Sequence, residues 1–156
     1  IRKYLAEFQI DIMHYCFMPN HIHLLIRARK AKDLPKFMQA ILQVYASYFR
    51  KKYNSVGFIF QNRYKSYLID KESYLLECAR YIERNPMRAK ITSSLLDYPW
   101  SSFSFYARGM GNAIITLGNP LYLELAKTEP ERKQQYQDYL SEERPYEDIV
   151  DKVFRT

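Results

Sequence analysis

The sequence lacks the features that mark membrane proteins, secreted disulfide-rich proteins and repeat proteins. No apolar run approaches the roughly 20 residues of a membrane-spanning helix, and no signal peptide is visible. The two cysteines, Cys16 and Cys78, lie in apolar-patterned segments, which favours free thiols in a reduced compartment. There is no internal repeat and no low-complexity tract. We therefore expect a cytoplasmic chain of one domain with at most a short appendage, since 156 residues can bury a genuine core.

The N-terminal residue is also informative. The sequence begins with Ile1 and not with Met. We therefore expect an N-terminal piece to be missing or disordered, and an opening strand to be lost with it.

The charge and the aromatic content favour an acidic polymer as partner. The chain has 24 Lys and Arg against 17 Asp and Glu, and 15 tyrosines against one tryptophan. Basic and aromatic residues interleave in residues 49–53 and 61–67. This mixture suits single-stranded nucleic acid, whose phosphates attract cations and whose bases stack on rings. The alternative, a basic protein that binds no nucleic acid, stays open, because many mildly basic proteins are of this kind.

Hydrophobic patterning predicts a mixture of strands and helices. Two strands are expected at about residues 9–18 and 21–28, separated by a turn at Pro19 and Asn20. Asp33 is expected to cap a long helix with an apolar stripe on one side. A turn at 54–57 and short strands at 58–60 and 66–69 follow.

A second helix is expected from a cap at Asp70 to about Asn85, because Pro86 disfavours helical geometry in the residue before it. We expect residues 98–103 to form a loop that leads into a short helix rich in aromatic residues. From about residue 120 a helical tail is expected, more acidic than the rest through Glu129, Glu131, Glu142, Glu143, Glu147 and Asp148.

These elements predict an α+β fold in which helices cover one face of an antiparallel sheet. The exposed face of that sheet is expected to carry His21 and His23. We divide the chain into a domain over residues 1–108 and a helical C-terminal extension over residues 109–156.

Two of the three histidines stand one residue apart in an apolar segment. Side chains alternate along a strand, so His21 and His23 share one face while Ile22, Leu24 and Ile26 line the other. A pair of imidazoles on one face can grip a divalent metal ion. Two surface histidines on a half-buried strand are the alternative. The third, His14, is expected to be a partly buried strand histidine and not a ligand.

Tyr81 is the second residue of interest. Helical geometry places it at the flank of the apolar stripe formed by Leu75, Cys78 and Ile82. Asn85 lies four residues further on, so both side chains can meet one target. The alternative is that Tyr81 only packs, as most tyrosines do.

Four segments carry a resemblance to a known family. Residues 18–25, Met-Pro-Asn-His-Ile-His-Leu-Leu, resemble the HUH motif of the single-tyrosine (insertion-sequence-200-like) transposases, in its Pro-Asn-His-hydrophobic-His form. Residues 80–89, Arg-Tyr-Ile-Glu-Arg-Asn-Pro-Met-Arg-Ala, resemble the tyrosine-helix motif of the REP-associated branch. Residues 61–66 and 98–103 match two further blocks of that branch, in the same order.

The resemblance implies a ferredoxin-like sheet and the cleavage and rejoining of single-stranded DNA. By carry-over, Tyr81 matches the nucleophile that forms a 5′-phosphotyrosine, and His21, His23 and Asn85 match the ligands of Mg²⁺ or Mn²⁺. A metal would stabilise charge at the phosphate, and covalent storage of the bond explains the tyrosine.

The resemblance also bears on DNA contacts. Residues inside the matched motifs are the expected DNA contacts: Asn20, Arg63, Lys65 and Arg88. Glu83 and Arg84 stand where relatives often have uncharged residues, and we expect them to alter how the helix meets DNA. Trp100 can stack on a base or belong to the core.

Three functions remain in competition. The first is the active transposase, acting on hairpin-forming single strands as a monomer or a homodimer. The second is a hairpin-binding protein derived from such an enzyme that no longer cleaves. The third is a phosphodiesterase that activates water, although no cluster of carboxylates accompanies the histidine pair, as such sites usually require. The target DNA and the role of the acidic tail are not readable from the sequence.

Overall fold

The computed structural model of the chain describes residues 1–144, which fall into two compact units. The first unit contains Ile1–Asp11 and Arg27–Tyr67, and the second contains Ile12–Ile26 and the described residues from Leu68 onward. Both helices and an antiparallel sheet are present, so the predicted α+β class is confirmed. The predicted division at residue 108 stays a prediction.

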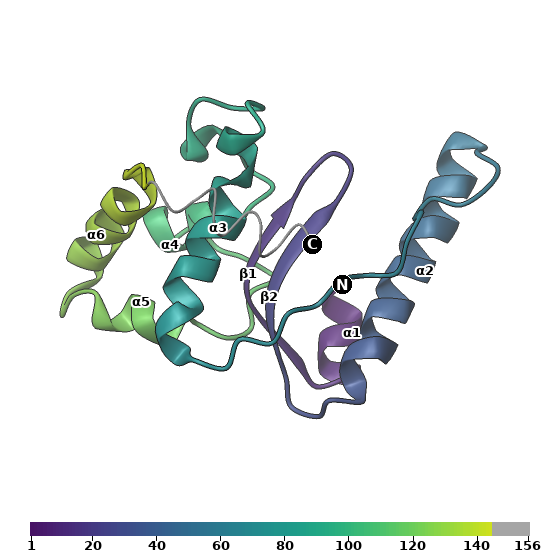
Figure 1. Cartoon of the computed structure of the whole chain (residues 1–156), viewed down its shortest axis with the longest axis horizontal. Helices are drawn as coiled ribbons and strands as arrows, with labels where there is room; N and C mark the ends of the chain where they lie inside the picture. Colours follow the sequence, from purple (N-terminus) through teal and green to yellow (C-terminus); the bar gives the residue numbers. More distant parts are fainter. Residues whose placement is uncertain (145–156) are drawn as a thin grey trace. The chain divides into compact units, whose positions relative to one another are not determined.

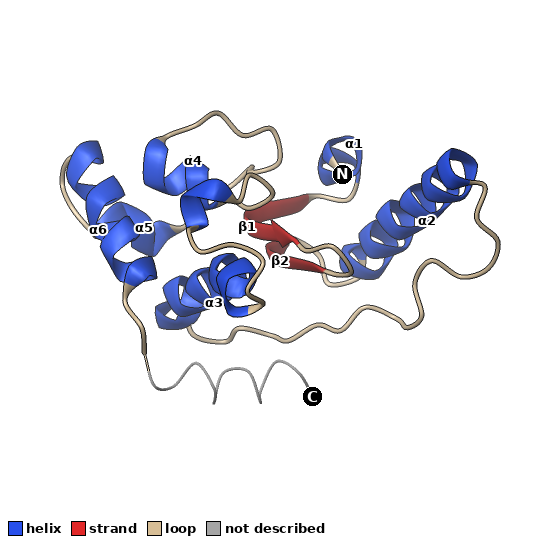
Figure 2. Cartoon of the chain, turned by 90° about the horizontal axis from the view of Figure 1, so that it is seen from above, coloured by secondary structure: helices blue, strands red, loops and turns tan. Residues whose placement is uncertain are grey.

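The sheet is the hairpin that the sequence predicts. β1 (Ile10–Phe17) and β2 (Ile22–Ala28) pair antiparallel, as Figure 2 shows. The segments expected as strands at 58–60 and 66–69 are irregular instead, and within the described residues the sheet has two strands. That prediction was wrong because these segments bury too little apolar surface to pair as strands: Phe58 is 97% exposed and Leu68 is 93% exposed.

The first unit is built on two helices. α1 (Arg2–Glu7) packs against the first half of α2 (Asp33–Tyr53), where the buried side chains Phe37, Met38 and Ile41 lie (Figure 1). Asp33 does not cap α2 as predicted. It is the first helical residue, and Lys32 occupies the cap position without a side-chain hydrogen bond. In the first turn, the Asp33 carboxylate still complements the helix dipole.

The second unit packs the hairpin against α3 (Leu75–Arg88). Leu25 of β2 is buried with Met13, Cys78 and Ile82, so the face of β2 that carries His23 and Leu25 is the covered one. Ile22 on the other face is 37% exposed. The expectation that this sheet face is exposed was therefore wrong around Leu25, where the apolar stripe of α3 packs on it, although His21 itself is exposed.

The limits of α3 also differ from the prediction. Asp70 does not cap it, because a short 3₁₀ helix, η1 (Glu72–Tyr74), precedes it. The helix continues through Pro86 to Arg88. Proline cannot donate to the carbonyl four residues back. The Asn85 side-chain amide compensates, since its Nδ2 donates to the carbonyls of Tyr81 at 2.7 Å and Ile82 at 3.5 Å.

The C-terminal part is helical, as predicted. After η2 (Leu95–Asp97) and α4 (Phe103–Arg108) come α5 (Pro120–Glu124) and α6 (Glu129–Ser141). α6 packs against both α3 and α4. The acidic residues Glu147 and Asp148 of the predicted tail lie outside the described residues. No described helix is long and apolar enough to cross a membrane.

Loops cover the outer edge of β1. The Phe17 amide donates to the carbonyl of Trp100, and Cys16 and Ser101 form an isolated antiparallel bridge. Further along, the Thr116 amide donates to the carbonyl of Ile12 at 3.0 Å. The backbone groups on this side of the strand are thus satisfied within the second unit.

A buried carboxylate joins four parts of the second unit. Glu83 of α3 is fully buried, and its Oε1 lies 2.8 Å from Nδ1 of His14 on β1. The Ser102 hydroxyl donates to Oε1 at 2.5 Å, and the Tyr136 hydroxyl of α6 donates to Oε2 at 2.8 Å. Asn119 contacts the other ring nitrogen of His14 at 3.0 Å. The carboxylate is therefore satisfied inside the protein.

This network corrects one expectation and confirms another. Glu83 and Arg84 do not face DNA, since both are buried and Arg84 donates to the Leu140 carbonyl at the end of α6. His14 lies in β1 as expected, and it is fully buried where the sequence predicted partial burial.

We predict that Glu83→Ala lowers the free energy of unfolding by about 3–5 kcal/mol, because it strands the buried polar groups of His14, Ser102 and Tyr136. Urea denaturation followed by circular dichroism measures the change. Glu72→Ala removes an exposed carboxylate and should stay within about 0.5 kcal/mol of the wild type. Equal losses in the two variants would contradict the role of the network.

The two thiols give a second prediction. Both cysteines are free and buried, and burial raises the pKa of Cys16 to about 12 and that of Cys78 to about 11. Only the thiolate reacts, so iodoacetamide at pH 8 should modify the native protein about 100-fold or more slower than the urea-unfolded protein. The native rate should also rise with pH. Mass spectrometry over time measures both rates, and a fast native thiol would refute the prediction.

Candidate active site

The histidine pair stands at the start of β2. His21 precedes the strand and His23 is its second residue, so alternation brings the two rings to one side. Their Nε2 atoms lie 3.0 Å apart, and the rings meet edge to face with centroids 4.8 Å apart. Two nitrogens at this distance can both reach one ion at the roughly 2.0–2.1 Å of a metal–imidazole bond.

Asn20 holds the ring of His21. Its Oδ1 lies 2.6 Å from Nδ1 of His21, which must therefore carry the proton and donate. This assignment leaves Nε2 of His21 with a lone pair for a ligand. Although the residue is exposed, partial desolvation lowers the pKa of His21, which favours the neutral imidazole that binds metals. Asn20, expected to contact DNA, thus orients a histidine in this structure.

Tyr81 lies beside the histidine pair of its own chain. Its ring centroid is 5.7 Å from that of His23, and the ring planes are nearly perpendicular. Tyr81 is half-buried and packs at the edge of the cluster around Leu25 and Ile82, as its flanking position on α3 predicts. Strand β2 fixes one side of the site and α3 fixes the other.

Asn85 and Arg88 follow Tyr81 on the same side of α3. The amide nitrogen of Asn85 is engaged with the helix backbone, which leaves its Oδ1 as the atom able to act as a ligand. The guanidinium carbon of Arg88 lies 5.2 Å from the Tyr81 ring centroid. A positive charge thus stands next to the phenol ring.

The donor set fits a divalent cation. Two neutral imidazole nitrogens and one amide oxygen suit Mn²⁺, and Mg²⁺ is an alternative that prefers oxygen. Among the described residues, no group of three or more His, Cys, Asp and Glu side chains could hold a metal ion. Asn85 is the amide that α3 presents beside Tyr81.

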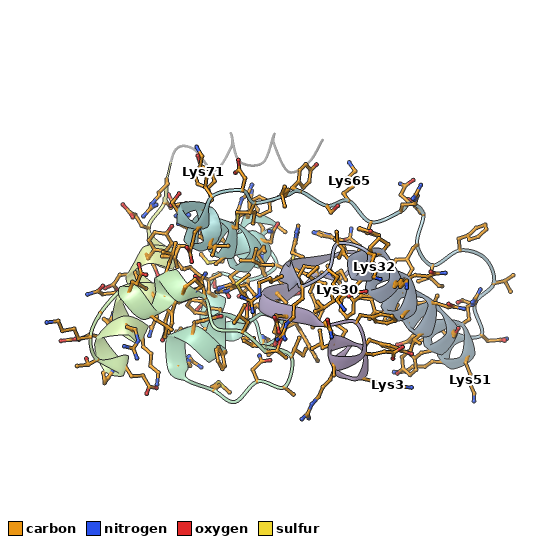
Figure 3. All side chains as sticks on the ribbon, turned by 90° about the horizontal axis from the view of Figure 1, so that it is seen from below. Lys3, Lys30, Lys32, Lys51, Lys65 and Lys71 are labelled. Atoms are coloured by element: carbon orange, nitrogen blue, oxygen red, sulfur yellow. The ribbon has the colours of Figure 1, made fainter. Side chains whose placement is uncertain are left out.

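Arg63 and Lys65 belong to the first unit, whereas the histidine pair and Tyr81 belong to the second. Both basic residues are exposed, and Figure 3 shows Lys65 on the extended segment after α2. Trp100 is 63% exposed, so it does not belong to the core, which was one of its two expected roles.

Sequence reasoning missed the residues that hold α3 in place. Glu83 and Arg84 were expected to affect how the helix meets DNA, and Arg80 was given no role, yet all three are buried under α6. His14 could have pointed to Glu83. It stands in a strand whose residues are nearly all buried, and a buried imidazole requires a polar partner.

Comparison with known proteins agrees with these observations. A model of the family described as "Transposase IS200 like" matches residues 1–85, which contain the histidine pair, Tyr81 and Asn85. No curated protein and no solved structure matches the chain. Because the family model covers more than half of the sequence, the chain belongs to the IS200-like transposases.

Proposed function

We propose that the protein cleaves and rejoins single-stranded DNA through a covalent bond between Tyr81 and a 5′-phosphate, with a divalent metal ion bound by His21, His23 and Asn85. Membership of the transposase family supports an enzyme that binds and processes DNA. The tyrosine nucleophile, the metal and the single-stranded substrate are the further steps that we propose.

One observation carries the proposal: a tyrosine, a histidine pair and an amide meet in one chain. Tyr81 contacts His23 edge to face, and the two histidines direct their Nε2 atoms toward each other. A tyrosine that only packs needs no such neighbours. Since all of these residues belong to one chain and one compact unit, we propose that the site is completed within a single subunit.

In the cleavage step, one ester bond at phosphorus is exchanged for another. The Tyr81 phenol oxygen attacks phosphorus, the bond to the 3′ oxygen breaks, and the leaving strand takes a proton to become a 3′-hydroxyl. The guanidinium of Arg88 beside the ring stabilises the phenolate. A bound divalent ion would polarise the phosphate and stabilise its charge. Attack by another 3′-hydroxyl reverses the step and rejoins DNA.

The proposed substrate is hairpin-forming single-stranded DNA, as in the REP-associated branch that the motifs resemble. Net positive charge supports a polyanionic partner, and Arg63 and Lys65 are proposed to contact it. We expect the protein to act as a monomer or a homodimer, and light scattering would measure which.

We predict that Tyr81→Phe abolishes the covalent product. The variant keeps the ring packing but has no oxygen to attack phosphorus. Wild-type protein, labelled hairpin-bearing single-stranded DNA and Mn²⁺ are incubated, denatured and separated on a gel. Tyr74→Phe is the control, because Tyr74 is an exposed tyrosine that directly precedes α3. This variant should form the adduct.

Each other outcome identifies a different function. Cleavage that continues in Tyr81→Phe without an adduct would mean attack by water. Tight binding without cleavage or adduct by the wild type would favour the hairpin-binding protein.

We predict that His21→Ala and His23→Ala each weaken Mn²⁺ binding by about 10-fold or more, because each removes one nitrogen ligand. Electron paramagnetic resonance of free Mn²⁺ measures this without any DNA. Asn85→Asp keeps a ligand oxygen and should bind Mn²⁺ at least as well as the wild type. Unchanged binding in both histidine variants would refute the metal site.

A further inference from the structure

The second half of α2 carries an exposed stripe of aromatic residues. Tyr45, Tyr48, Phe49, Lys52 and Tyr53 follow the i, i+3, i+4, i+7, i+8 spacing of one helix face, and we call them the aromatic stripe. An apolar face of this kind normally packs into a core. Here the exposed fractions are 48% for Tyr45, 54% for Tyr48 and 57% for Tyr53.

The rings form a continuous surface. Tyr45 and Phe49 have centroids 6.0 Å apart, and Phe49 and Tyr53 have centroids 4.6 Å apart. Phe60, from the segment after α2, lies 5.9 Å from Tyr45. The Lys52 ammonium lies over the rings of both Tyr48 and Tyr53, at 5.4 and 5.3 Å. One cation is therefore built into an array of rings.

Within the first unit, Phe60 contacts one end of this surface at Tyr45, and Tyr48 and Tyr53 remain more than half exposed. The buried side chains of α2, Phe37, Met38 and Ile41, all lie in its first half. α1 packs against α2, and Figure 1 shows it beside that half. Tyrosine is well suited to such an exposed position because its ring is apolar and its hydroxyl is polar.

The charge around the stripe identifies the partner. Residues 34–67 contain six Lys and Arg and not one Asp or Glu. The cations follow the helix and the next segment, and Figure 3 shows Lys51 at the end of α2 and Lys65 further along. A second copy of the chain would bring like charges together here. A polyanion with flat, unpaired rings matches both the charge and the aromatic array.

We propose that the aromatic stripe of α2 is a binding surface for single-stranded DNA, on which unpaired bases stack on Tyr45, Tyr48 and Tyr53 while Lys52 contacts a phosphate. The inference rests on the proposed single-stranded DNA substrate and adds a surface outside the unit that contains Tyr81. It predicts binding without base preference, because every base has a face that can stack.

The test uses fluorescein-labelled (dT)20, which forms no hairpin, in EDTA so that no cleavage occurs. Fluorescence anisotropy of the full chain is expected to show about tenfold weaker binding for Tyr48→Ala and for Tyr45→Ala. Tyr48→Phe keeps the ring and should bind like the wild type. Gln43→Ala, on the opposite face of α2, is the matched control and should change nothing.

Salt dependence tests the cation separately. Lys52→Ala should reduce the slope of log affinity against log salt concentration by about 0.7, the value for one contact with a single strand. Lys36→Ala removes the same charge from the opposite face of α2 and should leave the slope unchanged. Circular dichroism checks that every variant is folded.

The outcomes separate this inference from the proposed function. Binding of (dT)20 is measured in EDTA and needs no covalent step, so a failed covalent-capture assay leaves this test intact. Equal binding by wild type, Tyr45→Ala and Tyr48→Ala would overturn the inference even where the adduct forms. Light scattering gives the oligomeric state, and variants that dissociate a dimer without weakening DNA binding would show that the stripe binds a second copy, which also overturns it.

Discussion

A single buried carboxylate constrains the second unit. Glu83 accepts hydrogen bonds from a strand, from the residue before α4 and from α6, and these bonds hold α3 at its rotation about the helix axis. Glu83 and Tyr81 are two residues apart, about 200° around the helix. Fixing the buried side of α3 therefore fixes the side that meets His23. The catalytic geometry that we propose depends on a contact made on the far side of the helix.

α6 contributes to the same constraint. Arg80 donates to the carbonyl of Tyr139 at 3.1 Å, and the Tyr139 hydroxyl donates to Glu77 at 2.5 Å. These bonds connect the polar side of α3 to the last turn of α6, where backbone carbonyls have no partner inside the helix. The C-terminal helices thus stabilise the tyrosine-bearing helix, although the family match ends at residue 85.

Local patterns predicted the parts of the fold that depend on local physics. Alternation located both strands, and helical spacing located α3 and placed Tyr81 at the edge of its core. The path through Pro86 was not predictable, since it depends on the Asn85 side-chain amide replacing a backbone donor. The burial of Glu83 also escaped prediction, because it depends on partners 53 and 69 residues away in sequence. For the candidate site, residue types and spacing sufficed to choose the histidines, but the roles of Asn20 and Arg88 required coordinates.

The covered edge of β1 affects how this hairpin could associate with other chains. Exposed strand edges are templates for intermolecular pairing, and proteins commonly block them. Here Trp100, Ser102 and Thr116 occupy the hydrogen-bonding positions that an added strand would need. A foreign strand therefore cannot extend the sheet from β1 within the second unit without displacing these loops. Sheet extension between molecules, whether ordered assembly or aggregation, is restricted on this side of the hairpin.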